Sequence, residues 1–551
     1  EKNTTAMIYT LENCSGKPVT LTLEPFFKMV PRENVLEEKK SFSFAKGVLK
    51  DDQYTLYIKT DAMLEEKVTQ WQCVVRSGDH TLYIRTDAKL SACEPEWQWL
   101  AYPEDVKDGR PEKGMAFSCC QVTKALADGE TAAFEVSFSL EDAAVSGKAL
   151  MDAHYARQQK LLDLAGLSDP LAQQLVLAAD AYIARRDSTN GKTILAGYPL
   201  FSDWGRDTMI ALPGCTLSRC DYEAAKSLIQ TFLAYEKDGL VPNLFPEGQA
   251  QPMYNTVDAA LLLIDCVWQY VERTGDMAFA EEAWPVMESI VSHYQTGTHH
   301  SIGMDSDGLI FAGGGLDQVT WMDVCVEGIL PTPRHGKPVE INAYWYNALK
   351  IMEAFCSITG CDAAPYGALA AQVKESFLNT FYMADKGYLK DVISGTYNDE
   401  QLRCNQIWAV SMPFGMLTRE QERSVVDTVR RHLYTPCGLR TLSPEDPEYH
   451  PNYGGDMVSR DMAYHQGTTW VFPMGAYYRA YLKVHGSTRA AAAEVRQQLT
   501  RLVPMLRQGC AGQLPEIYDG DRPHAGKGCF AQAWSVGEML RVYEEVEKIL
   551  G

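Results

Sequence analysis

The hydrophobic period of the chain changes near residue 149, and this change constrains the fold more than any other feature. Before it, segments such as PVTLTLEPFF, HTLYIRT and AAFEVSFSL alternate apolar and polar residues and are rich in β-branched and aromatic side chains, which is typical of half-buried strands. After it, apolar residues recur at the spacing of one helix face. At 551 residues the chain is also too long for one hydrophobic core. We therefore predict an N-terminal all-β sandwich over residues 1–145, a linker helix over 146–168 and an all-α domain over 169–551.

The β-rich half contains a short internal repeat. YTLYIKTDAMLEE begins at Tyr54, and HTLYIRTDAKLSA begins at His80. Alternation of this kind is what one face of a sheet requires. We therefore interpret the repeat as two similar strands of one sheet rather than as a pair of binding motifs.

The second half carries twelve helical patterns, roughly 170–187, 206–218, 221–235, 254–274, 277–298, 340–360, 364–380, 402–416, 418–432, 464–484, 488–506 and 530–548. Asp221 is placed to cap one of them, and Gly275 and Gly360 stand where helix C-termini favour a left-handed residue. Long connections alternate with short ones, which favours six helical hairpins closed into an (α/α)6 toroid. Long loops inside a compact domain are usually functional, so we expect the site there.

Charge and cysteine usage limit the possible partners and location. The formal net charge of −21 argues against nucleic acid and anionic membranes as partners, because phosphate groups require a positive surface. No apolar run reaches the length of a membrane-spanning helix. The 15 cysteines are irregularly spaced, include the neighbours Cys119 and Cys120 and form no CxxC pair, which favours reduced thiols and a cytoplasmic location. The sequence begins at Glu1 rather than at Met, which leaves a removed signal peptide open.

No metal or cofactor is expected from the motifs. The histidines are scattered, and neither an HExxH motif nor a carboxylate cage occurs. FAGGGLD lacks the GxGxxG spacing and the strand–helix context of a dinucleotide site. A GxSxG nucleophile elbow is also missing.

Carboxylates, amides and indoles recur in or beside the long loops. Such groups suit the hydroxyls and the apolar face of a sugar ring, so the set predicts a carbohydrate site. Singly, several have structural alternatives: Asp207 and Asn255 as helix caps, Trp345 and Trp534 as core residues, and His465 as a helix-start histidine. The candidate substrate-binding residues are Trp204, Arg206, Asp207, Tyr254, Asn255, Asp258, Trp321, Glu340, Trp345, His465, Gln466, Trp470 and Trp534.

An ordered series of segments between Tyr198 and Ser535 resembles the glucosidase domain of glycogen debranching enzymes, the amylo-α-1,6-glucosidases, which have a glucoamylase-like (α/α)6 barrel. The segments are DWGRDTMIALPG, YNTVDA, TWMD, TPRHGKPVEINAYWYNAL, CGLRTLSPED, YHQGTTWVFP, LPEIYDG and FAQAWS. The β-rich half resembles the N-terminal domain of bacterial and archaeal members, with its first part missing. No segment resembles the transferase barrel of the eukaryotic bifunctional enzymes, so the resemblance implies no transferase activity.

The resemblance also implies residue roles. Arg206 and Asp207 would hold the terminal glucose, Asp323 would be the general acid and Glu516 the general base. Glycoside hydrolysis needs such a pair, one carboxylic acid for the leaving oxygen and one carboxylate for water. Asp323 follows Trp321 and Met322, and an apolar neighbourhood of this kind raises the pKa of a carboxyl group, as an acid requires. Inversion is implied by the family and predicts a gap of about 6.5–9.5 Å between the two carboxyl groups.

The expected function is exo-acting hydrolysis of α-1,6-linked glucose, with an α-glucan or oligosaccharide as the partner. Two alternatives stay open: a glucosidase of the same fold acting on other short α-glucosides, and a carbohydrate-binding protein whose catalytic pair has decayed. The presence of both TWMD and LPE argues against decay. The sequence leaves the oligomeric state open.

Overall fold

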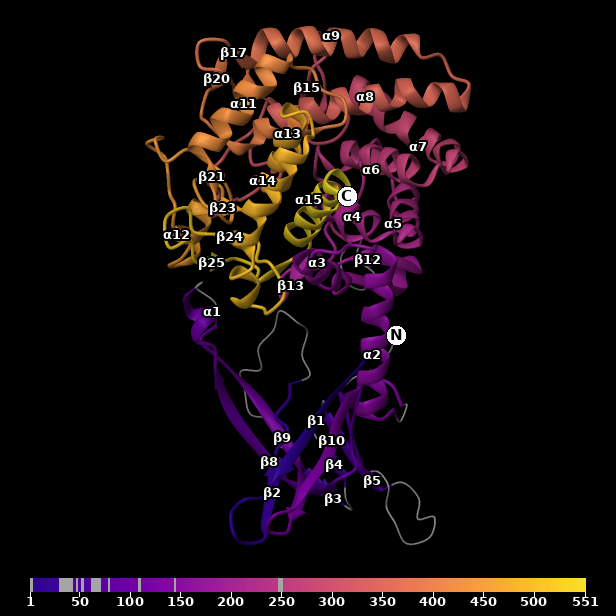
Figure 1. The fold of residues 1–551 in the computed structure, drawn as a ribbon, viewed down its shortest axis with the longest axis vertical. Helices are drawn as coiled ribbons and strands as arrows, with labels where there is room; N and C mark the ends of the chain where they lie inside the picture. The colour runs from indigo at the N-terminus through magenta and orange to yellow at the C-terminus, as the bar shows by residue number, and fades with distance from the viewer. Residues whose placement is uncertain are drawn as a thin grey trace. The chain divides into compact units, whose positions relative to one another are not determined.

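The structure is a computed structural model that describes residues 3–28, 43–45, 48–50, 54–60, 71–77, 80–107, 111–142, 145–245 and 251–551 (Figure 1). The chain divides into two compact units, Glu1–Lys160 and Leu161–Gly551. Each unit has a buried apolar cluster of its own. We describe the two units separately.

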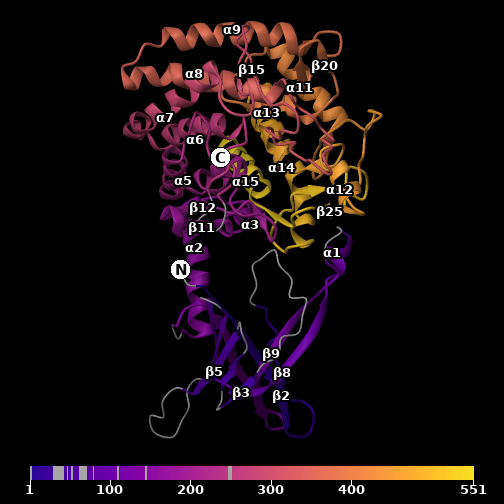
Figure 2. The ribbon, with the colours of Figure 1, turned by 180° about the vertical axis from the view of Figure 1, so that it is seen from behind.

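The N-terminal unit consists of two antiparallel sheets. One has seven strands in the order β1-β10-β7-β6-β5-β4-β3, and the other has the order β2-β9-β8; the long strands β8 and β9 run together in Figure 2. The strands are β1 (Thr4–Glu12), β2 (Val19–Leu23), β3 (Ser43–Ala45), β4 (Val48–Lys50), β5 (Tyr54–Thr60), β6 (Trp71–Ser77), β7 (His80–Thr86), β8 (Lys89–Ala101), β9 (Lys113–Leu126) and β10 (Thr131–Ser139).

Both sheets contribute to one core. Val75 and Ile84 of the seven-stranded sheet belong to the same buried cluster as Leu90 and Phe117 of the three-stranded sheet. Two sheets that share a core in this way form a sandwich, and the predicted N-terminal β region is confirmed. The repeat strands β5 and β7 pair with opposite edges of β6, so they are two strands of one sheet. Residues 61–66 of the first copy lie outside the described residues.

The second unit is mainly helical, as predicted. After α2 (Gly147–Ala165), which lies where the linker helix was expected, the described residues of this unit form twelve helices and the short α12 (Met457–Ala463). They are α3 (Pro170–Asp180), α4 (Gly205–Cys215), α5 (Tyr222–Ala234), α6 (Ala259–Thr274), α7 (Met277–Thr296), α8 (Val339–Thr359), α9 (Ala364–Phe381), α10 (Trp408–Ser411), α11 (Arg419–His432), α13 (Phe472–Val484), α14 (Arg489–Leu499) and α15 (Ala533–Leu550).

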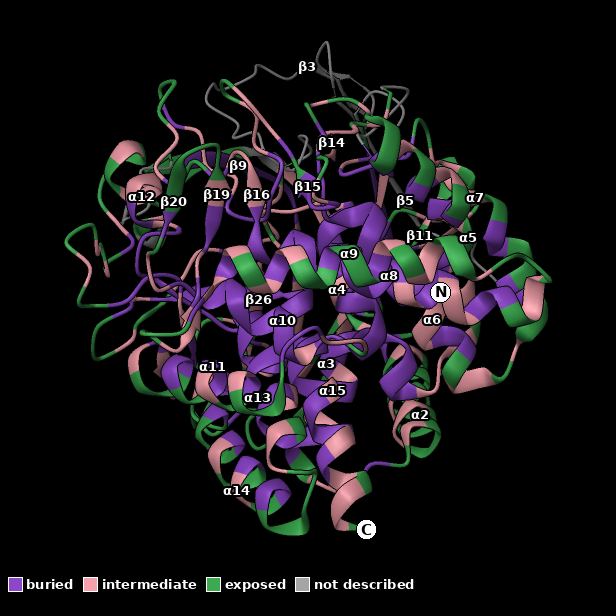
Figure 3. Cartoon of the chain, turned by 90° about the horizontal axis from the view of Figure 1, so that it is seen from above, coloured by how far each residue is buried: buried purple, intermediate pink, exposed green. Residues whose placement is uncertain are grey.

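Six of these helices pack on one another in a series that returns to its start. The series is α4, α6, α8, α10, α13 and α15, and α15 packs on α4 again. The backbones of α4 and α15 approach so closely at Gly214 that a side chain there would collide with the carbonyl group of Gly537. Buried residues cover most of α4, whereas α14 alternates buried and exposed residues (Figure 3). Neighbouring helices such as α9 on α8 cover the outside of the series.

Five predicted helices differ clearly from the structure. The helix expected over 254–274 begins only at Ala259, and the helix expected over 488–506 ends at Leu499. The segment 170–187 leaves the helix after Asp180 and continues as strand β11 (Ile183–Arg186). The helix expected over 402–416 is reduced to a 3₁₀ turn, Cys404–Ile407, and the four residues of α10, because Pro413 follows. The helix expected over 464–484 begins only at Phe472, after a turn with Gly467 at φ +138° and strand β23 (Thr469–Trp470). None of the helices among the described residues combines the length and apolar character needed to cross a membrane.

Candidate active site

Arg206 forms the charged centre of the candidate site. It lies in the first turn of α4 and is 2% exposed. Its Nε donates to Oδ2 of Asp258 at 2.6 Å, and its Nη1 donates to Oδ2 of Asp323 at 2.7 Å. One guanidinium fork therefore joins two carboxylates from separate segments of the chain.

Asp323 is the more open of these two carboxylates. Its side chain is 33% exposed, compared with 3% for that of Asp258. Burial raises the pKa of the Asp323 carboxyl, while the charge of Arg206 and its hydrogen bond oppose the rise. Because the net direction is upward, Asp323 keeps a proton to a higher pH than an ordinary aspartate does. A carboxyl with these properties is suited to protonate a leaving group.

Asp207 is a further buried carboxylate, next to Arg206 in the first turn of α4. Its Oδ1 accepts from Nε2 of Gln532 at 3.2 Å. Burial raises its pKa well above the ordinary value, and the charges of Glu516 and Asp323 raise it further. The residue that occupies the N-cap of α4 is Trp204, which makes no side-chain capping bond, so the capping alternative for Asp207 is not supported.

Glu516 is held by two hydrogen-bond donors. It precedes β24 (Ile517–Tyr518) directly and is 3% exposed. Its Oε1 accepts from the hydroxyl of Tyr464 at 2.5 Å, and its Oε2 accepts from the backbone N–H of Cys529 at 3.1 Å. A side chain at Gly528, whose φ is +63°, would collide with Oε2. Each oxygen of the carboxylate is thus fixed by a donor of its own.

The sequence reasoning missed Tyr464. Its only signal was its place directly before His465 in the motif YHQGTTWVFP. The hydrogen bond to Glu516 spans 52 positions of sequence, so no local pattern reveals it.

An aromatic cluster made of Trp321, Tyr464, His465, Trp470, Phe472 and Trp534 lies beside the carboxylates. Trp321 meets His465, Trp470 and Phe472 edge to face, with ring centroids 5.4, 5.1 and 5.0 Å apart. Its indole N–H donates to Oδ1 of Asn405 at 2.8 Å, which fixes the ring. Trp534 stacks on Phe472 at 4.3 Å. The cluster gives this end of the unit rigid aromatic surface.

Four of the predicted substrate-binding residues present buried polar atoms that find no hydrogen-bond partner within the described part of the chain. They are Oδ1 of Asn255, Oδ1 of Asp258, both ring nitrogens of His465 and Nε1 of Trp534. Burial lowers the pKa of His465 well below its ordinary value, so the ring stays neutral and offers one donor and one acceptor. Buried polar groups are rarely left unpaired in native proteins, which indicates a polar ligand.

Three other predicted residues are occupied by contacts within the protein. Both carboxylate oxygens of Glu340 accept from Arg334. Trp345 is fully buried, donates to the carbonyl of Gly308 at 3.1 Å and stacks on Tyr294. Gln466 accepts from Nη2 of Arg403 at 2.6 Å and donates to the carbonyl of Pro331 at 2.5 Å. The placement of these three favours structural roles over direct sugar binding, and for Trp345 it agrees with the core alternative.

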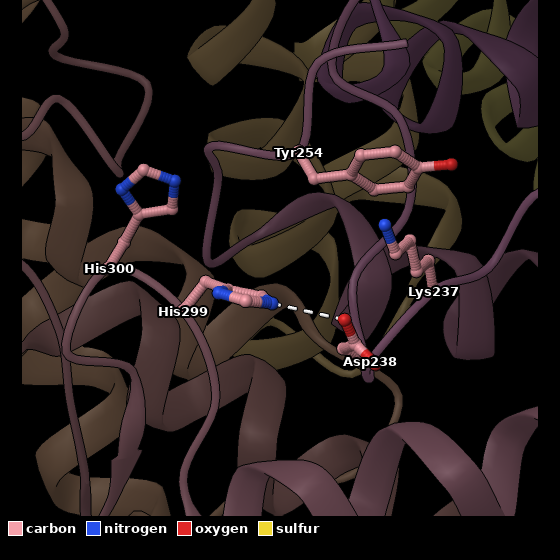
Figure 4. A pocket seen from close by; sticks show the side chains of 5 residues that line it. All are labelled: Lys237, Asp238, Tyr254, His299 and His300. Atoms are coloured by element: carbon pink, nitrogen blue, oxygen red, sulfur yellow. Dashed lines mark hydrogen bonds and ion pairs between the residues drawn. The ribbon is translucent and has the colours of Figure 1, made fainter. Parts of the chain in front are cut away.

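Two further predicted residues are Tyr254 and Trp204. Tyr254 lines a cavity of about 340 Å³ together with Lys237, Asp238, His299 and His300 (Figure 4). Its hydroxyl donates to the carbonyl of Tyr235 at 2.8 Å. His299 is bonded to Asp238 at 3.0 Å. Trp204 is half-buried and stands edge-on to Phe201. The cavity and Trp204 border the segments that carry Asp258 and Arg206.

The carboxylates of this site are held by arginine and by neutral donors rather than spaced as metal ligands. Among the described residues, the one group of three ligand-type side chains with donor atoms within 4.8 Å of one another is Cys73, Cys119 and Cys120 of the N-terminal unit. Asp323 accepts from Arg206, and Glu516 accepts from Tyr464 and from the backbone N–H of Cys529.

Comparisons with known proteins agree with this chemistry. Residues 177–541 match the amylo-alpha-1,6-glucosidase family. The chain is 25% identical over 498 residues to the glycogen debranching enzyme of Saccharomyces cerevisiae, covering 69% of this chain and 32% of that protein. It thus spans about a third of the length of this curated relative.

Solved structures share the fold. The GH63 mannosylglycerate hydrolase from Thermus thermophilus, in complex with glucose, matches with a TM-score of 0.50 at 15% identity, over 68% of this chain and 99% of that chain. An uncharacterized conserved protein from the same organism matches with a TM-score of 0.50 at 14% identity, with the same coverage. At this level of identity the similarity concerns the fold alone.

Proposed function

Because the chain belongs to the amylo-alpha-1,6-glucosidase family, it is a glycoside hydrolase, and we propose that it removes single α-1,6-linked glucose units from the branch stubs of glycogen, limit dextrin or a related α-glucan. In this proposal residues 169–551 form the catalytic domain. The helix series from α4 to α15 that closes on α4 supports an (α/α)6 toroid for this domain. The loops at one end of the toroid hold the site.

The buried polar atoms without partners carry the proposal. A glucose ring presents hydroxyl groups in several directions, and each hydroxyl both donates and accepts. The free atoms of Asn255, Asp258, His465 and Trp534 supply both kinds of group beside an aromatic cluster. A pocket with few polar groups among aromatic walls is typical of a site for one small ring. We propose exo-action because a site for one ring admits only a chain end.

The two catalytic candidates differ in exposure and in the groups that hold them. Asp323 has a raised pKa and a partly exposed side chain, which suits the general acid. Glu516 is fixed by Tyr464 and the Cys529 N–H, which suits a base that must hold one water in line. In the mechanism, Asp323 protonates the glycosidic oxygen while Glu516 takes a proton from the attacking water. Asp207 and Arg206 hold the glucose in the reactive orientation.

Replacement of Asp258 tests the role of Asp323 as acid. The charge of Asp258 raises the pKa of Asp323, so Asp258→Asn is expected to lower it. Because a general acid acts in its protonated form, activity is lost as pH rises through its pKa, and the basic limb of kcat/KM should move to lower pH. A pH–rate profile measures the shift. The control is Asp265→Asn, a second buried aspartate of α6, which should leave that limb in place.

The first product should be β-glucose. An inverting pair places water on the face opposite the leaving group, so an α-linked stub yields the β-anomer. Proton NMR of the early product from a 6-O-α-glucosyl maltooligosaccharide measures this directly. Initial α-glucose would contradict the assignment of Glu516 as base, and release of maltose or longer fragments would contradict exo-action. Rapid cleavage of linear maltooligosaccharides without α-1,6 activity would instead support action on other α-glucosides.

A further inference from the structure

The core of the N-terminal unit contains a group of three thiols, Cys73, Cys119 and Cys120, which we call the thiol triad. Cys73 lies on β6 of the seven-stranded sheet, and the other two lie on β9 of the three-stranded sheet. The three Sγ atoms lie within 4.8 Å of one another, and each residue is at most 2% exposed. The triad therefore joins the two sheets at the centre of the sandwich.

The strand geometry is altered at this point. Neighbouring residues of a strand normally face opposite sides of the sheet, yet Cys119 and Cys120 both belong to the core cluster, together with Phe117 and Val122. The register of β8 against β9 shifts beside them, between the pairs Ala92–Cys120 and Glu96–Ser118. Irregularities of this kind change the direction of side chains and are over-represented near functional sites. Here the shift brings a second adjacent thiol inward.

The chemistry of three converging thiols is specific. Thiolates select soft ions such as Zn²⁺ and Cu⁺ over hard ions. A zinc–thiolate bond is about 2.3 Å long, so tetrahedral sulfur ligands lie about 3.8 Å apart. The Sγ atoms of the triad lie no more than 4.8 Å apart, so each pair needs to approach by no more than about 1 Å to reach this spacing. A fourth thiol, Cys93, lies on β8 between the two pairs where the register shifts.

We propose that the thiol triad binds one thiophilic d10 metal ion, Zn²⁺ or Cu⁺, and thereby links the two sheets of the N-terminal unit. Binding forms three metal–sulfur bonds and releases the thiol protons to solvent, with no change of oxidation state. The site is structural and independent of the glucosidase activity. Its affinity falls as pH falls, because protons compete for the same sulfur atoms.

Titration of the reduced, chelator-treated chain with Cd²⁺ tests the site. We expect one equivalent to bind with thiolate-to-metal charge-transfer absorption, and either Zn²⁺ or Cu⁺ to displace it, which identifies the preferred ion. Cys73→Ser and Cys120→Ser should each abolish the absorption. The matched controls Cys14→Ser and Cys361→Ser alter exposed thiols and should leave it unchanged. Persistence of the absorption in Cys73→Ser, or its absence in the wild-type chain, overturns the proposal.

A measurement without substitutions covers the case in which a core variant does not fold. X-ray absorption of the wild-type chain loaded with one equivalent of the preferred ion should show at least three sulfur neighbours, at about 2.3 Å for Zn²⁺. A shell dominated by nitrogen or oxygen, or one with fewer than three sulfur atoms, contradicts the proposal. Glucosidase activity should be the same with and without the ion, so failure of one proposal leaves the other intact.

Discussion

Asp323→Asn and Glu516→Gln are each expected to lower kcat by about 10²–10⁴-fold on a 6-O-α-glucosyl maltooligosaccharide, because each removes one general acid–base group. Both substitutions nearly preserve volume. In Asp323→Asn the new amide oxygen can still accept from Nη1 of Arg206, as the carboxylate does. In Glu516→Gln the new amide oxygen can still accept from the backbone N–H of Cys529, and the new NH2 group can donate to the hydroxyl oxygen of Tyr464. Loss of activity should therefore occur without unfolding. Release of glucose measures the activity, and circular dichroism measures the folded state.

The matched control is Glu445→Gln. The Glu445 side chain is 76% exposed and pairs only loosely with His432, at 3.3 Å, so the variant should keep the wild-type kcat. A kcat close to that of the wild type in Asp323→Asn would show that Asp323 is not the acid. The same result for Glu516→Gln would remove Glu516 as the base. Equal loss in Glu445→Gln would point to a general effect of charge rather than to catalysis.

Much of the fold follows from local sequence patterns. The alternation in HTLYIRT and the Asp221 cap of α5 act within a few residues, and both appear in the structure as predicted. The local patterns predicted the wrong element where tertiary contacts determine the secondary structure. The segment after Asp180 has helical periodicity, but it forms strand β11, which pairs with β12 (Gly191–Ile194). Residues 464–470 do not continue as a helix, because β23 pairs with β22 (Gly438–Arg440) and with β24.

The site shows the same division. Arg206, Asp258 and Asp323 were identified by residue type and motif, and the structure joins them by direct hydrogen bonds. Tyr464 was missed because its contact with Glu516 depends on the folded arrangement of two distant loops. Cys119 and Cys120 were visible as neighbours, but the third thiol of the triad comes from another sheet.

The motif that carries Glu340 is connected to the aromatic cluster by hydrogen bonds. Its carboxylate is bound by Arg334, which also donates to Asp391 at 2.7 Å. Asp391 accepts from Asn405 at 2.8 Å, and Asn405 in turn accepts from the indole of Trp321. A continuous chain of hydrogen bonds therefore runs from Glu340 to the aromatic cluster. We infer that this series of hydrogen bonds positions Trp321.

Removal of Arg334 should have the largest effect on stability. Arg334→Met leaves Glu340 and Asp391 buried without a cation, and each of their side chains is 1% exposed. Breaking a buried pair by removing one partner costs about 3–5 kcal/mol, so the free energy of unfolding should fall by about that amount at neutral pH. Chemical denaturation followed by Trp fluorescence measures the loss.

The pH dependence identifies the cause of that loss. Burial already raises the pKa of Glu340, and Arg334 opposes the rise, so removal of Arg334 raises the folded-state pKa further. A carboxyl with a raised pKa destabilises the fold above its unfolded pKa, and protonation at lower pH relieves the cost. The deficit of Arg334→Met should therefore shrink as pH falls. Arg430→Met, which breaks the half-exposed pair with Glu494, should cost no more than about 1 kcal/mol. Equal losses in the two variants, or a deficit that does not change with pH, would show that the buried charges are not what Arg334 compensates.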